Sequence, residues 1–314
     1  MKKPGYVIAV VGPTGVGKSR LAQDIAVIRR GVVLSADSMQ IYRNLDIGTA
    51  KISPENRRVA HYGLDLVDFG TTYSAAQYQK YAREKIDDCF AKDILPVVCG
   101  GTGLYIRAAL DEMDFAPGEQ DDNLIRAGYE ALLENEGTQA LYEKLREKDP
   151  SACDLIHPNN TKRVIRALEM ADTGSRYSDI AKNFKTRVSY YPTCYIGLDL
   201  EREELYRRID RRVDMMINEG LLGEVEELID NGLLDTITAS QAIGYKELSR
   251  VVMQGIPLSD AIEQIKQDTR RYAKRQLTWF RSDPRVKWIN VDDKSTTDII
   301  GNAQDIISSF EEGR

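Results

Sequence analysis

The sequence predicts an α/β protein in which a parallel β-sheet has flanking helices and is interrupted by a helical insertion. Three observations predict this class. Short apolar runs alternate with helical patterns over the first hundred residues, which favours parallel strands joined by right-handed crossovers. A glycine-rich GPTGVGKS motif directly follows the first apolar run. Residues 115–187 carry helical patterns with no convincing strand between them. The motif makes the expected fold P-loop NTPase-like.

Each expected element rests on a local pattern. Apolar runs bounded by turn residues predict strands at YVIAVV, GVVLSAD, LPVVCGG, CYIGLDL (194–200) and VKWINV (286–291). Helices are predicted from Lys18, after Tyr73, over 123–136, 138–148 and 160–172, and from about Glu201. We therefore expect a core domain made of residues 1–114 and 188–314, and a helical insertion domain over 115–187.

Composition excludes several protein classes. The 314 residues are 42% apolar and 29% charged, with a net charge of −6, which is close to the globular average. The longest apolar runs, such as Val7–Val11, are far shorter than the ~18 residues of a membrane span. The four cysteines form no C-x-x-C pair, which favours reduced thiols. We expect a cytoplasmic protein without membrane contact that acts as a monomer.

The GPTGVGKS motif predicts a polyphosphate site. Its glycines allow backbone N–H groups to surround phosphate oxygens, and the following helix adds its positive N-terminal dipole. Lys18 would neutralise phosphate charge, and the Ser19 hydroxyl would ligate Mg²⁺. The predicted diphosphate- or nucleotide-binding residues are Gly12, Pro13, Thr14, Gly15, Val16, Gly17, Lys18 and Ser19.

Two further charged residues are candidates for the same site. Asp37 follows the second strand, at the same sheet edge as the loop. A carboxylate there can hold Mg²⁺ through water, accept a proton from a nucleophile, or cap the following turn. Arg212 lies at the border of the apolar stripe of a helix over 202–219. A guanidinium there needs an anionic partner, which is either a substrate or a core carboxylate.

Basic residues gather in two segments despite the acidic total. Residues 266–287 contain eight basic and two acidic residues, and residues 158–187 contain seven and three. Such segments are typical of a polyanion-binding surface. The alternative is a pair of solvated helix faces.

Several motifs together resemble the tRNA dimethylallyltransferases, which prenylate N6 of adenosine 37 in the anticodon loop. The similarity runs in order from about Val7 to Trp288, most of the chain. It is carried by GPTGVGKS, SADSMQIYRNLDIGTAK, YSAAQY, GGTGLY, IHPNN with KRVIRALE, AIGYKE and KRQLTWFR. The resemblance implies a P-loop core with a helical insertion, and transfer of the prenyl group from dimethylallyl diphosphate to tRNA with Mg²⁺ present.

The resemblance also implies residue roles. In this family the loop holds the diphosphate of the prenyl donor rather than ATP. Asp37 matches the base at N6, Thr14 a substrate contact, and Arg212 the diphosphate-binding arginine that acts with Lys18. The matching tRNA contacts are Asp37, Ser38, Met39, Gln40, Thr102, Arg126, Lys162, Arg163, Arg166, Lys274, Arg275, Gln276, Thr278, Trp279 and Arg281.

Two other functions fit part of the pattern. A P-loop kinase of a small metabolite would explain the loop, but not the basic segments or the KRQLTWFR motif. A nucleotide-dependent RNA-binding switch would explain the basic segments, but not a carboxylate beside the phosphate loop. Prenyl transfer to tRNA uses all of these features.

Overall fold

The sheet of the protein is parallel throughout, as the sequence predicts. A computed structural model describes residues 5–115 and 123–314. Its six strands lie in the order β3-β2-β4-β1-β5-β6, and every neighbouring pair is parallel. They are β1 (Val7–Val11), β2 (Val32–Ser35), β3 (His61–Tyr62), β4 (Pro96–Gly100), β5 (Thr193–Asp199) and β6 (Lys287–Asn290).

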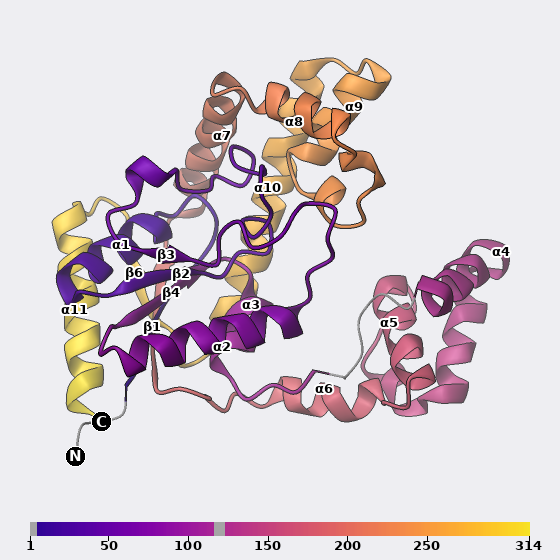
Figure 1. Ribbon diagram of the computed structural model, residues 1–314, viewed down its shortest axis with the longest axis horizontal. Helices are drawn as coiled ribbons and strands as arrows, with labels where there is room; N and C mark the ends of the chain where they lie inside the picture. The colour runs from indigo at the N-terminus through magenta and orange to yellow at the C-terminus, as the bar shows by residue number, and fades with distance from the viewer. Residues whose placement is uncertain (1–4, 116–122) are drawn as a thin grey trace. The chain divides into compact units, whose positions relative to one another are not determined.

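Helices cover both faces of this sheet (Figure 1). Helices α1 (Lys18–Arg29) and α11 (Thr296–Glu312) pack on one face, while α2 (Ala75–Ala91) and α3 (Gly103–Leu110) pack on the other. Side chains of β1 alternate between the two cores, since Val7, Ala9 and Val11 join one cluster and Ile8 and Val10 join the other. The central strand is therefore buried on both sides, which explains its continuous apolar run.

Four more helices follow β5 and precede β6 along the chain. They are α7 (Arg202–Asn218), α8 (Leu221–Asp230), α9 (Tyr245–Gln254) and α10 (Leu258–Arg281). Helix α10 packs against α7, α9 and α3, and so brings the late part of the chain to the end of β4. Short 3₁₀ turns lie at Pro54–Asn56, Pro150–Asp154, Leu233–Asp235 and Ala239–Gln241.

The chain divides into two compact units. One consists of Met1–Leu110 and Tyr191–Arg314, and the other of Asp111–Tyr190. The second unit contains α4 (Asn123–Lys148), α5 (Thr161–Asp172) and α6 (Tyr177–Lys185) around a small apolar core. Gly137, at φ 81° and ψ −178°, breaks α4, where the sequence predicts the boundary between two helices. Residues 116–122 of the predicted insertion lie outside the described residues.

None of the helices in the described ranges combines the length and the apolarity that a membrane crossing requires. All four cysteines are free thiols.

Candidate active site

The phosphate loop forms a tight turn between β1 and α1. Gly12 has a φ of 142°, and a Cβ atom there would lie 2.6 Å from the Leu198 carbonyl oxygen, so only glycine fits. The Lys18 ammonium donates a hydrogen bond to the Pro13 carbonyl at 2.7 Å. Because the loop joins the carboxyl end of β1 to the start of α1, the N-terminus of α1 lies at the carboxyl edge of the sheet, where the helix dipole would stabilise an anion.

Two cavities open beside this loop. The first, which we call the phosphate cavity, has a volume of about 90 Å³ and includes Lys18, Ser19 and Gln40 in its lining. The second, the apolar cavity, has a volume of about 300 Å³ and is lined by apolar side chains from α7, α8 and α10 together with polar residues. Five residues line both cavities. They are Thr14, Asp37, Thr49, Arg212 and Tyr272.

The cations at this junction are partly stripped of water. Burial lowers the pKa of Lys18 to about 8, and the charge of Arg212 acts in the same direction. Burial also lowers the pKa of Arg212, against the effect of Asp37 and Glu219. Among the described residues Arg212 has no salt bridge, so the core-carboxylate alternative is not supported. An anion that enters the phosphate cavity would therefore compensate two desolvated cations.

Asp37 lies just beyond β2, where its side chain caps a backbone turn and also lines both cavities. Its Oδ1 atom accepts a hydrogen bond from the Met39 N–H group at 2.9 Å. The capping role considered from the sequence is therefore present. The same side chain lines both cavities, and its charge acts on Lys18 and Arg212. Capping thus does not remove Asp37 from the site.

Helix α10 ties together the loops that follow β1 and β4. The Gln276 side chain accepts a hydrogen bond from the Thr14 N–H group at 2.8 Å and donates one to the Gly101 carbonyl at 3.0 Å. The Thr102 hydroxyl oxygen accepts a bond from the Ser38 N–H group at 3.1 Å. Gln276 is only 4% exposed. Its amide is therefore used to position the loops, and these hydrogen bonds favour a structural role over direct RNA binding.

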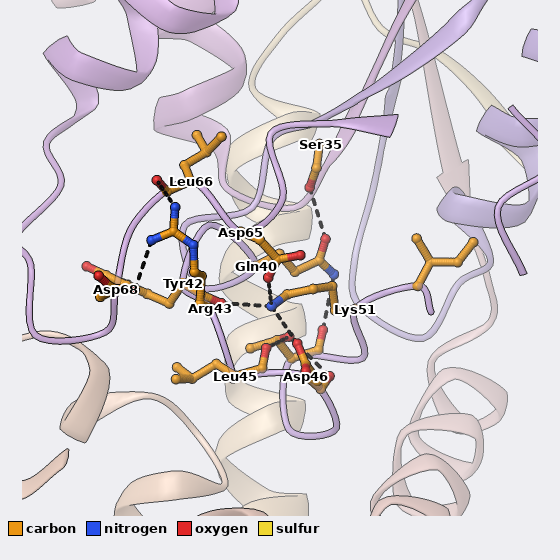
Figure 2. A network of polar contacts seen from close by, with 12 residues as sticks. Ser35, Gln40, Tyr42, Arg43, Leu45, Asp46, Lys51, Asp65, Leu66 and Asp68 are labelled. Carbon is orange, nitrogen blue, oxygen red and sulfur yellow. Dashed lines mark hydrogen bonds and ion pairs between the residues drawn. The ribbon is translucent and has the colours of Figure 1, made fainter. Parts of the chain in front are cut away.

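Gln40 also acts inside the protein (Figure 2). Its side chain accepts a hydrogen bond from the Ser35 hydroxyl at 2.9 Å and donates one to the Thr49 carbonyl at 3.1 Å. Figure 2 shows that Lys51 also bonds several residues of the segment between β2 and β3. The Lys51 ammonium bonds the Tyr42 carbonyl at 2.7 Å and two carboxylates, those of Asp46 and Asp65, at 2.6 Å each. Thr49 is thereby held at the junction of the cavities.

Glu224 of α8 also holds the segment between β2 and β3. Its carboxylate accepts hydrogen bonds from the N–H groups of Asp46, Ile47 and Gly48 at 3.2, 2.8 and 3.3 Å. It also accepts one from the Tyr245 phenol at 2.5 Å. Glu224 therefore fixes the cavity-lining residues of the segment between β2 and β3 to those of α9.

The other predicted tRNA contacts fall into two groups. On α10, the side chains of Lys274, Arg275, Thr278, Trp279 and Arg281 are exposed. Arg281 is paired with Asp199 at 2.7 Å. The contacts predicted from the insertion lie in the second unit, whereas the cavities lie in the first. They are Arg126, Lys162, Arg163 and Arg166.

Sequence reasoning missed Tyr272 and Thr49. Tyr272 forms hydrogen bonds with Thr102 and Gln276, while burial, followed by the charge of Asp37, raises its pKa to about 12. It lies four residues before Gln276 on α10, and this i,i+4 spacing is a signal that could have found it. Thr49 lies inside the SADSMQIYRNLDIGTAK motif that carries the family resemblance, and that motif is the signal that could have found it.

No group of three or more His, Cys, Asp or Glu side chains in the described part of the chain is arranged to hold a metal ion.

Comparison with known proteins identifies the family. A family model described as IPP transferase matches residues 40–283. The tRNA dimethylallyltransferase of Geobacillus thermodenitrificans is 46% identical over 289 residues, 91% of each chain. A crystal structure of the full-length tRNA isopentenylpyrophosphate transferase from Bacillus halodurans aligns with a TM-score of 0.72 at 39% identity, covering 99% of this chain and 98% of that one.

A structure of a eukaryotic dimethylallyltransferase acting on tRNA aligns with a TM-score of 0.80 at 27% identity, covering 97% of this chain and 80% of that chain. These matches confirm the resemblance that the sequence motifs indicate. The chain belongs to the IPP transferase family.

Proposed function

We propose that the protein transfers the dimethylallyl group of dimethylallyl diphosphate to N6 of adenosine 37 in the anticodon loop of tRNA and releases diphosphate. Its relatives are named as tRNA dimethylallyltransferases. The observation that carries the proposal is the junction of a phosphate cavity with an apolar cavity at Asp37 and Arg212. A molecule with a diphosphate at one end and a hydrocarbon at the other matches that junction.

The two ends of the donor have different needs. The diphosphate is placed against Lys18 and Arg212, whose desolvated charges it would neutralise. The five-carbon group is placed among Val213, Met216 and Ile265 of the apolar cavity, because burying hydrocarbon surface there is favourable. This arrangement puts the reacting carbon near Asp37.

Mg²⁺ fits the phosphate cavity. Ser19 and Asp37 supply oxygen atoms to its lining, and Mg²⁺ is usually held by one or two protein groups together with phosphate oxygens and water. When bound, the ion would reduce the negative charge of the diphosphate. We propose the Ser19 hydroxyl as its protein ligand.

The chemistry is a displacement at the allylic carbon. The N6 lone pair forms the new C–N bond while the C–O bond to the diphosphate breaks and its electron pair leaves with the diphosphate. Lys18 and Arg212 stabilise the charge that develops on this leaving group. The N6 lone pair is delocalised into the ring, so removal of an N6 proton by Asp37 assists bond formation.

The tRNA must bring its base to this junction. An adenine inside a stacked loop is out of reach, so the base is extruded into the apolar cavity. Ser38, Met39, Thr102 and the exposed face of α10 are proposed to bind the RNA near the cavity. The insertion domain, residues 115–187, is proposed to add Arg126, Lys162, Arg163 and Arg166. Gln40 and Gln276 then act by fixing the loops. Because the substrate is tRNA, we place the reaction in the cytoplasm.

The direct test is incubation of the protein with an unmodified tRNA anticodon stem-loop and labelled dimethylallyl diphosphate, with ATP as a competing donor. We expect label in the RNA at adenosine 37 and release of diphosphate, with little effect of ATP. Phosphoryl transfer from ATP to a small molecule, with no label in the RNA, would instead favour the kinase.

A further inference from the structure

A buried carboxylate in the second unit contacts two of the arginines assigned to tRNA. Glu169 lies on α5, and its side chain is 6% exposed. Arg126 of α4 reaches its two oxygens at 2.8 and 3.2 Å, and Arg166 of α5 reaches Oε2 at 3.4 Å. Both arginine side chains keep 26% of their surface exposed. Glu169 therefore lies against two guanidinium groups that still face solvent, and Arg126 Nη1 also lies 3.6 Å from the exposed Glu130 carboxylate.

The position of this carboxylate conflicts with simple electrostatics for RNA binding. At about 100° per residue, Lys162, Arg166 and Glu169 lie within about 60° of one another on α5. A negative charge on the basic face of a helix lowers the local positive potential, and so opposes binding of a polyanion. Its burial is also costly unless it is paired. Because Glu169 is paired with both arginines, the lowered positive potential is the effect that its role must outweigh.

Preorganisation of the arginines supplies such a role. A guanidinium carries five N–H donors in a rigid planar fork, so a carboxylate that binds one edge leaves donors on the other edge in a fixed direction. Ordering a long side chain before the RNA arrives reduces the entropy lost on binding. The two guanidinium groups held by Glu169 then present a prepared surface to phosphate oxygens.

We propose that Glu169 is a positioning residue for tRNA binding, which holds Arg126 and Arg166 in the geometry that contacts the RNA backbone. The inference rests on the proposed function, because that function assigns the two arginines to tRNA.

The test uses a substitution for which charge alone and positioning predict opposite changes in tRNA affinity. Glu169→Gln removes a negative charge from a basic face, so charge alone predicts tighter tRNA binding. Positioning predicts weaker binding, with the tRNA Kd of the full-length protein raised about fivefold at fixed salt. Glu143→Gln is the matched control, since it removes the same charge from an exposed site on α4 of the same unit. It should leave the affinity unchanged or slightly tighter.

A second measurement separates positioning from loss of folding. Glu169→Gln is repeated in the Arg126→Ala/Arg166→Ala background, where the carboxylate has no arginine to orient. We expect no further weakening there, and an unchanged affinity for dimethylallyl diphosphate in every variant, because the donor site lies in the other unit.

Unchanged or tighter binding by Glu169→Gln overturns the proposal, and so does equal weakening in the background without the arginines. If Arg126→Ala/Arg166→Ala itself leaves tRNA affinity unchanged while prenyl transfer persists, the assignment of these arginines to tRNA fails, whereas the reaction proposed for the core stands.

Discussion

Asp37 caps a turn and is proposed to act as the base, and one substitution can separate these two roles. Its Oδ1 atom accepts the Met39 N–H bond, and an asparagine carbonyl can keep that bond but cannot take a proton. We expect Asp37→Asn to slow single-turnover prenyl transfer by about 10²- to 10⁴-fold, the range for a lost general base. The affinities for tRNA and donor should stay within a few-fold.

Asp37→Ala is the comparison, because it also removes the cap. A rate loss in alanine that asparagine restores would assign the effect to the turn, and would contradict the role as a base. Donor affinity measured at two magnesium concentrations completes the test. If affinity and its magnesium dependence fall together with the rate, Asp37 acts on the metal.

We expect Lys18 to make donor binding depend on pH. In the free protein its pKa is lowered to about 8, so the ammonium loses its proton as pH rises through that value. The diphosphate binds the charged form more tightly, which means that donor Kd should rise above about pH 8. Isothermal titration from pH 6.5 to about 9.5 measures this step. Lys18→Ala should bind donor weakly at every pH and show no such step.

At the residue scale, sequence predicts what a motif or a strand end fixes. The loop at Gly12–Ser19 and Asp37 after β2 are placed by local pattern alone. The family resemblance predicts an RNA contact at Gln276, yet the fold uses its amide to join two loops. Tyr272 enters the site through the packing of a helix about 235 residues after Asp37, and such a contact depends on tertiary structure.

The segment between β2 and β3 behaves as an element although it is mostly loop. Lys51 fixes it from inside, with a side chain that is 3% exposed between Asp46 and Asp65. We expect Lys51→Met to lower the free energy of unfolding by about 1–3 kcal/mol, because it removes charge-assisted hydrogen bonds. The donor KM should also rise, since Thr49 loses its support. Denaturant unfolding and steady-state kinetics measure the two effects.

Arg43→Met is the control for this change. Arg43 lies in the same segment but is 47% exposed and pairs with Asp68 at 2.9 Å, so its removal should cost less than about 1 kcal/mol. If the two variants behave alike, the buried ammonium has no special part in holding the segment.

At the element scale, strong periodic patterns predict well and short or tertiary features do not. The buried runs of β1, β4 and β5 have apolar signals on both faces. Strand β3 has two residues, His61 and Tyr62, and pairs only because β2 offers a free edge in the fold, so no local pattern marks it. The break at Gly137 was predictable because glycine there adopts a positive φ.

At the scale of the whole molecule, charge counted along the sequence overstates the basic surface. Within residues 266–287, Lys266 pairs with Asp214 at 2.8 Å, Arg270 with Asp210 at 2.6 Å and Arg285 with Asp283 at 2.7 Å. Two of these three acidic partners lie on α7, which a count within the segment cannot include. The part of this segment that can attract RNA is therefore smaller than the sequence indicates.

Lys274 and Arg275 remain as exposed cations on α10, and Arg275 also lines the apolar cavity. If they bind phosphates, Lys274→Ala/Arg275→Ala should weaken tRNA binding and flatten the plot of log affinity against log salt. The slope should fall by about 0.7 to 0.9 for each phosphate that is no longer neutralised. Arg207→Ala/Arg211→Ala removes two exposed cations from α7 and serves as the control for net charge. Because long-range attraction is screened beyond about 10 Å at 0.1 M salt, this control should change the slope little. Equal changes in both variants would mean that the RNA responds to the overall charge of the protein and not to a site on α10.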